Sequence, residues 1–344
     1  MDILILGGTL FLGRHLVEAA LARGHRVTLF NRGSTGPTLF PEVEHLIGDR
    51  DGGLDALAGR RFDAVIDTCG YVPRVVRESA ALLADAARYY VFISSGSVYE
   101  DSDRASIGEN APICTINDEA NENVYGNYGP LKALCERAVE SAFAGRALHV
   151  RAGLIVGPYD VTGRLEYWVR RIAEGGEVLA PGRPDRQIQL IHARDLADWI
   201  FAMTEASRPG LFNAAGPAHR LTMRDLLDTC NALADDPAAL TWVDESFLLL
   251  NYVAPFADLP LWLPASQNGL LSMDIGKALA SGLRFRPLAD TLADTTRWLD
   301  EERAAGKKRP ARLASGVATR DALDRQRERA LLDAWKRSST KVTA

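Results

Sequence analysis

The chain has 344 residues, of which 47% are hydrophobic and 25% charged, and its net charge is −5. This composition is typical of a globular protein with one large domain or two interleaved ones. It excludes a bundle of membrane helices, because no apolar run approaches the roughly 18 residues of a spanning segment. We also expect no signal peptide, since a predicted strand begins at Asp2 and a glycine-rich loop follows at once.

The four cysteines are Cys69, Cys114, Cys135 and Cys230. They form neither a C-x-x-C pair nor a spacing typical of metal ligands. We therefore expect free thiols in a reducing cytoplasm and no metal site.

The first 155 residues alternate between short apolar runs and helical patterns. The apolar runs predict strands at Ile3–Leu6, Val27–Phe30, Glu44–Ile47, Ala64–Asp67, Tyr90–Ser94 and Leu148–Arg151. Helical spacing predicts helices at Leu12–Ala22, Arg74–Ala87 and Leu131–Phe143. Strands that alternate with helices indicate an α/β fold, a doubly wound parallel sheet of the Rossmann type. Ligands of such sheets bind outside the carboxyl ends of the strands.

The pattern changes after Gly157-Pro158. A helix is predicted around Leu165–Glu174. The run Gln187–Ile191 and a helix at Asp195–Glu205 are expected to rejoin the sheet, and Leu211–Asn213 predicts one more strand. The remainder of the chain is mostly helical in pattern.

These changes predict two lobes with a substrate cleft between them. The dinucleotide-binding Rossmann domain comprises residues 1–157 and about 187–215. A smaller, mainly helical substrate lobe comprises residues 158–186 and 216–344.

The segment from Glu301 to the end is basic, with 12 Lys and Arg against 6 Asp and Glu. A basic tail can bind nucleic acid or a membrane surface. We favour a solvated amphipathic helix, because apolar residues form a stripe among the charges. The stripe consists of Leu323, Ala330, Leu331, Ala334 and Trp335.

The loop after the first strand resembles the glycine motif that binds a dinucleotide. Its frame reads Gly7-x-x-Leu10-x-x-Gly13, so a leucine replaces the middle glycine. Gly7 can form the tight turn and Gly13 can let the helix pack closely. If Leu10 points away from the ligand, its backbone N–H can still join the helix N-terminus that faces the phosphates. We expect the leucine to modify the loop without abolishing the site.

The second strand indicates which dinucleotide binds. NAD-binding loops carry an acidic residue for the ribose 2′-hydroxyl about 20 residues on, whereas this chain has Asn31-Arg32. Arg32 can bind a 2′-phosphate with its planar guanidinium. The sequence therefore favours NADP over NAD.

Polar residues also end the third and fourth predicted strands. Asp49-Arg50 could meet the adenine, with the carboxylate accepting from its amino group. The run Asp67-Thr68-Cys69-Gly70 would lie near the ribose and phosphates. Both aspartates could equally be turn-forming residues.

Hydroxyl groups cluster where the fifth strand ends, in Ser94-Ser95-Gly96-Ser97. Further along, Tyr128 and Lys132 are four residues apart, so a helix places both on one face. A lysine ammonium beside the phenol lowers a pKa that starts near 10. Tyr128 is thus a candidate general acid or base for hydride-transfer chemistry.

With these motifs in order, the chain resembles the extended short-chain dehydrogenases/reductases, often labelled NAD-dependent epimerases/dehydratases. The resemblance covers residues 1 to about 215. Within it, Gly-Gly-Thr-x-Phe-Leu-Gly and Ile-Asp-Thr-Cys-Gly-Tyr resemble the branch that includes plastid stem-loop RNA-binding proteins. The chain departs from the family pattern at Leu10, at Cys69-Gly70 and at Glu100.

The resemblance implies a catalytic set of Ser95, Tyr128 and Lys132. It also implies that the segment Ala152 to Leu154 contacts the nicotinamide. The predicted cofactor contacts are Gly7, Thr9, Leu10, Phe11, Leu12, Gly13, Asn31, Arg32, Asp49, Arg50, Thr68, Cys69, Gly70, Ser94, Tyr128, Lys132, Ala152, Gly153 and Leu154.

For the substrate, arginines in a cleft suggest an anionic or nucleotide-linked molecule, and aromatic side chains would cover a sugar or ring face. Trp168 could equally be a core residue, and His192 a structural histidine. The candidates are Ser97, Tyr159, Arg164, Trp168, Arg186 and His192.

Three functions stay open at this stage. The first is an NADP-dependent oxidoreductase that acts on a small carbonyl or alcohol. The second is a nucleotide-sugar epimerase or dehydratase that holds NAD tightly. The third is an RNA-binding or redox-sensing module on the same fold, which the intact Ser95, Tyr128 and Lys132 disfavour. We expect a small-molecule substrate and no nucleic-acid or membrane partner, and we leave a homodimer open.

Overall fold

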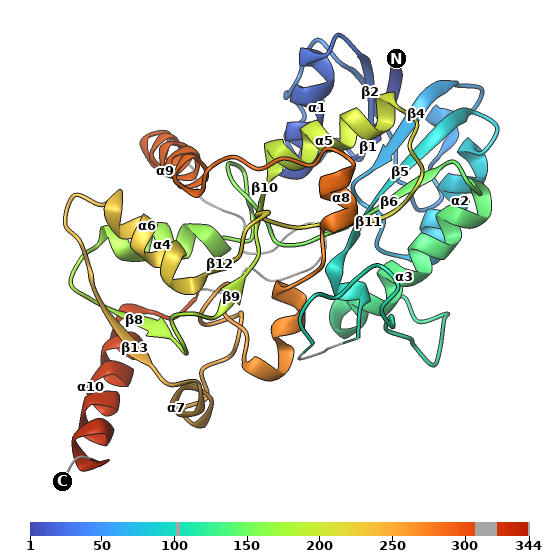
Figure 1. The fold of residues 1–344 in the computed structure, drawn as a ribbon. Coiled ribbons are helices and arrows are strands. Elements are labelled where there is room, and N and C mark those ends of the chain that lie inside the picture. The colour runs from blue at the N-terminus through green and yellow to red at the C-terminus, as the bar shows by residue number, and fades with distance from the viewer. Residues whose placement is uncertain (101–103, 307–321, 343–344) are drawn as a thin grey trace.

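A computed structural model describes residues 1–100, 104–306 and 322–342 (Figure 1). Within them, seven parallel strands form one sheet in the order β11-β6-β5-β4-β1-β2-β3. This is the predicted doubly wound sheet. Its strands are β1 (Asp2–Leu6), β2 (Arg26–Asn31), β3 (Glu44–Ile47), β4 (Phe62–Asp67), β5 (Ala87–Ser95), β6 (Ala147–Ala152) and β11 (Gly210–Ala214).

Helices cover both faces of this sheet because its strands are apolar on both sides. Successive residues of a strand point to opposite faces. In β1, Ile3 and Ile5 pack with α1 and α5, whereas Leu4 and Leu6 pack with α2 and α3. The four helices are α1 (Leu12–Ala22), α2 (Pro73–Leu83), α3 (Val124–Ala142) and α5 (Ala193–Glu205).

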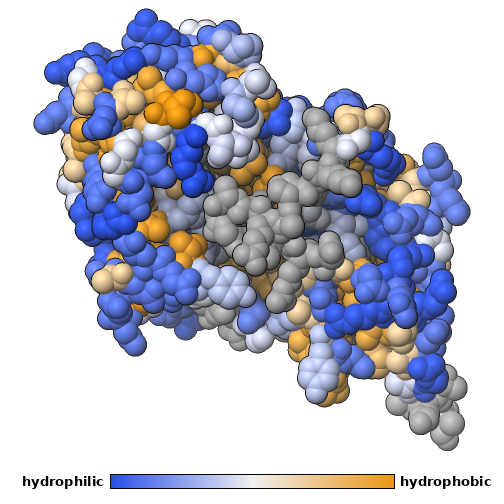
Figure 2. All heavy atoms as spheres, turned by 180° about the vertical axis from the view of Figure 1, so that it is seen from behind, coloured by the Kyte–Doolittle hydropathy of each residue, from blue (hydrophilic) through white to orange (hydrophobic). Residues whose placement is uncertain are grey.

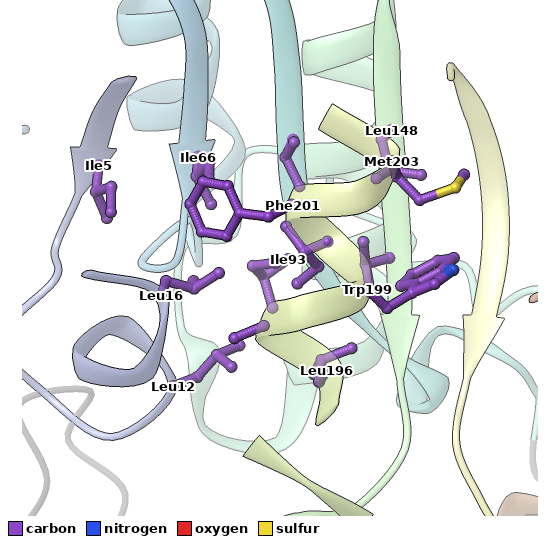
Figure 3. Close-up of a cluster of buried hydrophobic side chains, with 14 of the residues drawn as sticks. Ile5, Leu12, Leu16, Ile66, Ile93, Leu148, Leu196, Trp199, Phe201 and Met203 are labelled. Atoms are coloured by element: carbon purple, nitrogen blue, oxygen red, sulfur yellow. The ribbon is translucent and has the colours of Figure 1, made fainter. Parts of the chain in front are cut away.

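Figure 3 shows the core on the α1 and α5 face of the sheet. Ile5, Ile66 and Ile93 reach from three strands toward these helices. Leu16 and Phe201 meet them from α1 and α5, and all five side chains are buried. This packing fixes the start of α1, and with it the glycine loop, against the ends of the strands.

The part of the chain outside this sheet and its four covering helices contains more β-structure than predicted. Its helices are α4 (Arg164–Ala173), α6 (Met223–Ala232), α7 (Glu245–Leu250), α8 (Gly276–Ala280), α9 (Leu288–Ala304) and α10 (Arg325–Val342). Its strands are β7 (Ile155–Val156), β8 (Glu177–Pro181), β9 (Gln187–Ile188), β10 (Ile191–His192), β12 (Leu221–Thr222) and β13 (Ala239–Val243). They form three two-stranded sheets, β7 with β10, β9 with β12 and β8 with β13.

The prediction that Gln187–Ile191 rejoins the central sheet is wrong. This run splits into β9, which pairs antiparallel with β12, and β10, which pairs with β7. A short apolar run carries no information about its partner strand, and both partners are two-residue strands with weak patterns of their own.

The C-terminal helix α10 packs on the second lobe. Leu323, Leu331 and Leu332 are buried in its core, and Trp335 packs against Phe247 with 5.1 Å between ring centroids. The apolar stripe is therefore used in packing, although its Ala330 is exposed. The part of the basic tail at 307–321 and 343–344 lies outside the described residues.

The surface seen in Figure 2 is mostly hydrophilic, with smaller hydrophobic patches between the polar residues. Among the described residues, no helix combines the length and the apolar character needed to cross a bilayer.

Candidate active site

A cavity of about 1740 Å³ lies at the carboxyl ends of the sheet strands and extends into the second lobe. Single drug-sized ligands occupy pockets of roughly 300–1,000 Å³, so this volume suits a dinucleotide together with a second molecule. The predicted residues that line it are Gly7, Thr9, Leu10, Phe11, Leu12, Gly13, Asn31, Arg32, Asp49, Arg50, Thr68, Cys69, Ser94, Ser95, Ser97, Tyr128, Lys132, Ala152, Gly153, Leu154 and Arg164.

The conformation of the glycine loop lets a ligand and the start of α1 lie close to its backbone. Gly7 and Gly8 have φ values of +106° and +91°, which residues with a Cβ rarely adopt. A Cβ on Gly13 would lie 2.8 Å from Gly8 Cα, so only glycine lets α1 begin this close to the loop. No side chain caps α1 at its N-terminus, which leaves the helix end open to an anion.

Leu10, which replaces the middle glycine, is among the residues that line the cavity, and it is 38% exposed. The leucine therefore forms part of the cavity wall, and the backbone turn on Gly7 and Gly8 is retained.

The end of β2 offers a free arginine. Asn31 supports the loop, because its amide donates to the Gly7 carbonyl and accepts from the Gly33 N–H. Arg32 is exposed at the cavity edge and has no ion pair within the described part of the chain. Its positive charge thus remains available to a ligand.

Arg50 borders the cavity, but its guanidinium is occupied. It forms two 2.6 Å hydrogen bonds with the Asp67 carboxylate and donates to the Ser79 hydroxyl. The Tyr90 hydroxyl donates to the same carboxylate at 2.8 Å. Despite burial, the charge of Arg50 lowers the pKa of Asp67. The predicted contact of the Arg50 side chain with the cofactor is therefore not supported. Asp67 is a core ion-pair partner and also shapes the turn, since its carboxylate accepts from the Cys69 N–H at 3.1 Å.

Ser95 and Tyr128 both line the cavity, and their side chains are hydrogen-bonded to each other. Ser95 ends β5 and its hydroxyl accepts from the Ser97 N–H at 3.1 Å. Tyr128 lies just after a kink in α3, where Tyr125, Gly126 and Asn127 leave helical geometry. Burial raises the pKa of Tyr128, while a hydrogen bond with Ser95 and the charge of Arg164 oppose this rise. The phenol is therefore protonated at neutral pH.

Lys132 reaches the cavity from α3 but does not lower the Tyr128 pKa as predicted. Its ammonium group donates to the carbonyl oxygens of Gly70 at 2.8 Å and Ile93 at 2.6 Å. Burial lowers the pKa of Lys132. Two carbonyls thus hold the amine at the cavity wall, and one of its three N–H donors remains for a ligand.

Two predicted cofactor residues are used inside the protein. Gly70 is not part of the cavity wall: a Cβ there would lie 2.5 Å from the Phe92 ring, and its carbonyl accepts from Lys132. Ser94 borders the cavity, but its hydroxyl donates to the buried Glu136 carboxylate.

Four predicted substrate residues do not line the cavity. Trp168 is fully buried and donates to the Pro260 carbonyl at 2.7 Å. His192 caps α5 by accepting from the Arg194 N–H, and burial lowers its pKa to about 2. Packing between elements that are distant in sequence accounts for both placements.

Tyr159 and Arg186 are likewise committed to protein contacts. The Tyr159 ring lies 3.5 Å below the Arg14 guanidinium and packs edge-on against Trp298. Arg186 pairs with Glu245 at 2.9 Å. Of the six predicted substrate residues, Ser97 and Arg164 border the cavity.

The second-lobe wall was mostly missed by sequence analysis. Its residues come from α4, from the segment 255–273 and from the beginning of α10. Helical spacing predicted α4 and α10, but it did not show which of their residues would line the cavity. The missed wall residues include Tyr167, Phe256, Leu271, Met273, Leu323 and Arg325.

With this geometry established, comparison with known proteins identifies the family. The family described as NAD dependent epimerase/dehydratase matches residues 3–215. The chain belongs to this family. The match covers the sheet, the glycine loop and the Ser95, Tyr128 and Lys132 cluster.

A curated relative is the chloroplast stem-loop binding protein of 41 kDa b from Arabidopsis thaliana. It is 27% identical over 250 residues, which are 66% of this chain and 62% of that protein. The match thus spans less than two thirds of the relative's length. It agrees with the branch that the sequence motifs indicated.

Solved structures share the fold. The Bordetella bronchiseptica enzyme WbmH in complex with NAD+ is 16% identical, with a TM-score of 0.66 over 87% of this chain and 98% of that one. MoeE5 in complex with UDP-glucose and NAD is 17% identical, with a TM-score of 0.63 over 88% and 99%.

Proposed function

We propose that this protein is an oxidoreductase that transfers hydride between a nicotinamide dinucleotide and a carbonyl or alcohol substrate. The observation that carries the proposal is a single cavity. It holds the glycine loop, the Ser95 and Tyr128 hydroxyls and the Lys132 ammonium group. These groups are the ones that such a reaction requires.

The residues present fit a dinucleotide. The uncapped N-terminus of α1 can bind its phosphates, and Gly7, Gly8 and Gly13 leave room for close approach. The dinucleotide would supply or accept the hydride when bound. Ala152 to Leu154 border the cavity beside Ser95, where the nicotinamide would lie.

Tyr128 is the proposed proton donor and acceptor. Because burial raises its pKa, the phenol holds its proton near neutral pH and is ready to donate it to a forming alkoxide. Ser95 would bind the same substrate oxygen. Lys132, held by the carbonyls of Gly70 and Ile93, has one N–H left to bind a ribose hydroxyl.

Arg32 favours NADP, as the sequence predicted. It borders the cavity after β2, where a 2′-phosphate would lie, and Ser34 and Thr35 add hydroxyl groups beside it. No carboxylate of the described β2 end stands in this place to repel the phosphate. The structural relatives named above bind NAD, so cofactor choice is a direct test of this assignment.

A second candidate is a nucleotide-sugar epimerase or dehydratase that keeps NAD bound. The cavity supports it by extending well into the second lobe, with arginines and aromatic residues along the wall. An RNA-binding or redox-sensing role is disfavoured by the hydroxyl and amine groups gathered in a cavity. A cytoplasmic location and a homodimer stay predictions.

The test begins with the nucleotide. The purified protein is denatured and any released nucleotide is identified by mass spectrometry. The native protein is then titrated with NADPH and NADH. Exchangeable binding with preference for NADPH supports the reductase. Retained NAD that does not exchange supports the epimerase, and failure to bind either nucleotide overturns both.

A further inference from the structure

Arg164 differs from the other arginines of the second-lobe wall. Three other arginines border the same cavity, and each has a carboxylate oxygen within 4 Å. Arg170 pairs with Glu166 and Arg171 with Glu328, whereas Arg325 pairs with both Glu174 and Glu328. These pairs neutralise most of the positive charge on this wall.

The Arg164 guanidinium has neither an ion pair nor a hydrogen bond within the described ranges 1–100, 104–306 and 322–342. It lies 4.9 Å from the centroid of the Phe256 ring, which orients its plane. Asp160 stabilises the charge from beyond ion-pair distance, and burial lowers the pKa of Arg164. Arg164 is half-buried in the cavity wall, and with no protein partner its N–H donors are available to a ligand.

Its position relative to Tyr128 limits what it can bind. Both side chains border the cavity, and Arg164 is the cation that acts electrostatically on the phenol. Arg164 is also the first residue of α4, whose N-terminus has no side-chain cap. The Arg164 charge and the N-terminus of α4 therefore both create positive potential near the reacting carbon of the substrate, whose oxygen Tyr128 would protonate.

We propose that Arg164 binds an anionic group that the substrate carries next to its reacting carbon, and that this group is a carboxylate. The proposal rests on the proposed function, because Tyr128 defines where the reacting carbon lies. A planar carboxylate matches the two-pronged guanidinium geometry.

The experiment compares ligands that differ only in the acid group. With saturating NAD+ or NADP+, calorimetry measures binding of UDP-glucuronate against UDP-glucose, of glucuronate against glucose, and of UDP and inorganic phosphate alone. The variants are Arg164→Gln, Arg164→Lys and the matched control Arg170→Gln. Their melting temperatures establish folding.

The expected result is that the carboxylate member of at least one pair binds about tenfold or more tightly, as a charged hydrogen-bonded contact should. Arg164→Gln should abolish this difference, Arg164→Lys should keep part of it, and Arg170→Gln should keep all of it. The neutral partner should bind Arg164→Gln and the wild type within about twofold.

Other outcomes overturn the proposal. If Arg164→Gln weakens UDP and UDP-glucose as strongly as UDP-glucuronate, the arginine binds the diphosphate. If no carboxylate probe exceeds its neutral partner, or only phosphate binds, the assignment is wrong. Failure of NADH and NADPH to bind while the carboxylate preference persists would reject the proposed function and leave the anion site in place.

Discussion

The two walls of the cavity are built in different ways. On the sheet side, short strand ends present the glycine loop, Ser95 and Arg32 at one edge, because parallel strands finish together. On the lobe side, the wall comes from α4, the segment 255–273 and the start of α10, which meet only through tertiary packing. The sheet side thus holds the groups proposed for hydride-transfer chemistry, whereas the lobe side holds the proposed anion-binding arginine, Arg164.

The largest expected effect tests the sheet side. Changing Tyr128 to Phe removes the proton donor and leaves the ring in place. Turnover should fall about 10²–10⁴-fold, the range for loss of a general acid. Steady-state assay of dinucleotide oxidation with any accepted carbonyl substrate measures this.

Dinucleotide affinity serves as the control for that variant. It should stay within about twofold of the wild type, because the glycine loop is untouched. A Tyr128→Phe protein with full turnover would reject the assignment of Tyr128 as acid and leave only a binding cavity.

The same contrast explains how much the sequence predicted. The periodicity of apolar residues and the order of the predicted elements located the seven sheet strands and α1. This was possible because each of these elements carries its own pattern of apolar residues in the local sequence. Ser95, Tyr128 and Lys132 were found because motif spacing brings them to one strand end and one helix face. The placement of Tyr159, Trp168 and Arg186 depended on contacts with residues 59 to 139 positions away, which are Glu245, Pro260 and Trp298. His192 is instead used locally, as the cap of α5.

The hydrogen-bond partners of Lys132 and Arg50 could not be predicted from the sequence either. The i, i+4 spacing of Tyr128 and Lys132 is real, but the Gly70 and Ile93 carbonyls that hold the lysine come from two other strand ends. Likewise, Arg50 follows a strand as a ligand-binding residue would, yet Asp67 and Ser79 occupy its guanidinium.

The second prediction tests whether Arg50 is structural. Replacing it by Leu leaves the Asp67 carboxylate buried with one partner fewer. Loss of one member of a buried pair costs about 3–5 kcal/mol in the free energy of unfolding. Urea unfolding followed by circular dichroism measures it.

The double variant Arg50→Leu with Asp67→Leu is the control, because it removes the uncompensated charge and should recover part of the loss. The pH dependence has a defined sign. The folded pKa of Asp67 is lowered, so its contribution is present above the unfolded value near 4 and is lost as pH falls below about 4. Equal acid sensitivity in the wild type and the double variant would contradict the ion pair's role.

The third prediction tests whether Arg32, on the sheet side of the cavity, selects NADP over NAD. In Arg32→Ala, NADPH affinity should fall about tenfold to a hundredfold, because a charge-assisted contact with the 2′-phosphate is lost. NADH affinity should change by less than about twofold. Fluorescence titration with both nucleotides measures the ratio, and an unchanged ratio rejects NADP selection by Arg32.

The smallest effect is expected for Arg186, an arginine of the second lobe that lies outside the cavity. In Arg186→Gln, the ion pair with Glu245 is lost, but that carboxylate still accepts from the Ala265 N–H. Stability should fall by no more than about 1 kcal/mol, and affinity for every ligand that Arg164 discriminates should be unchanged. Calorimetric ligand binding to Arg186→Gln and Arg164→Gln therefore distinguishes the effect of a positive charge elsewhere in the second lobe from that of the positive charge in the cavity wall. If both variants lose carboxylate affinity equally, long-range electrostatics governs binding, and the wall has no dedicated anion site.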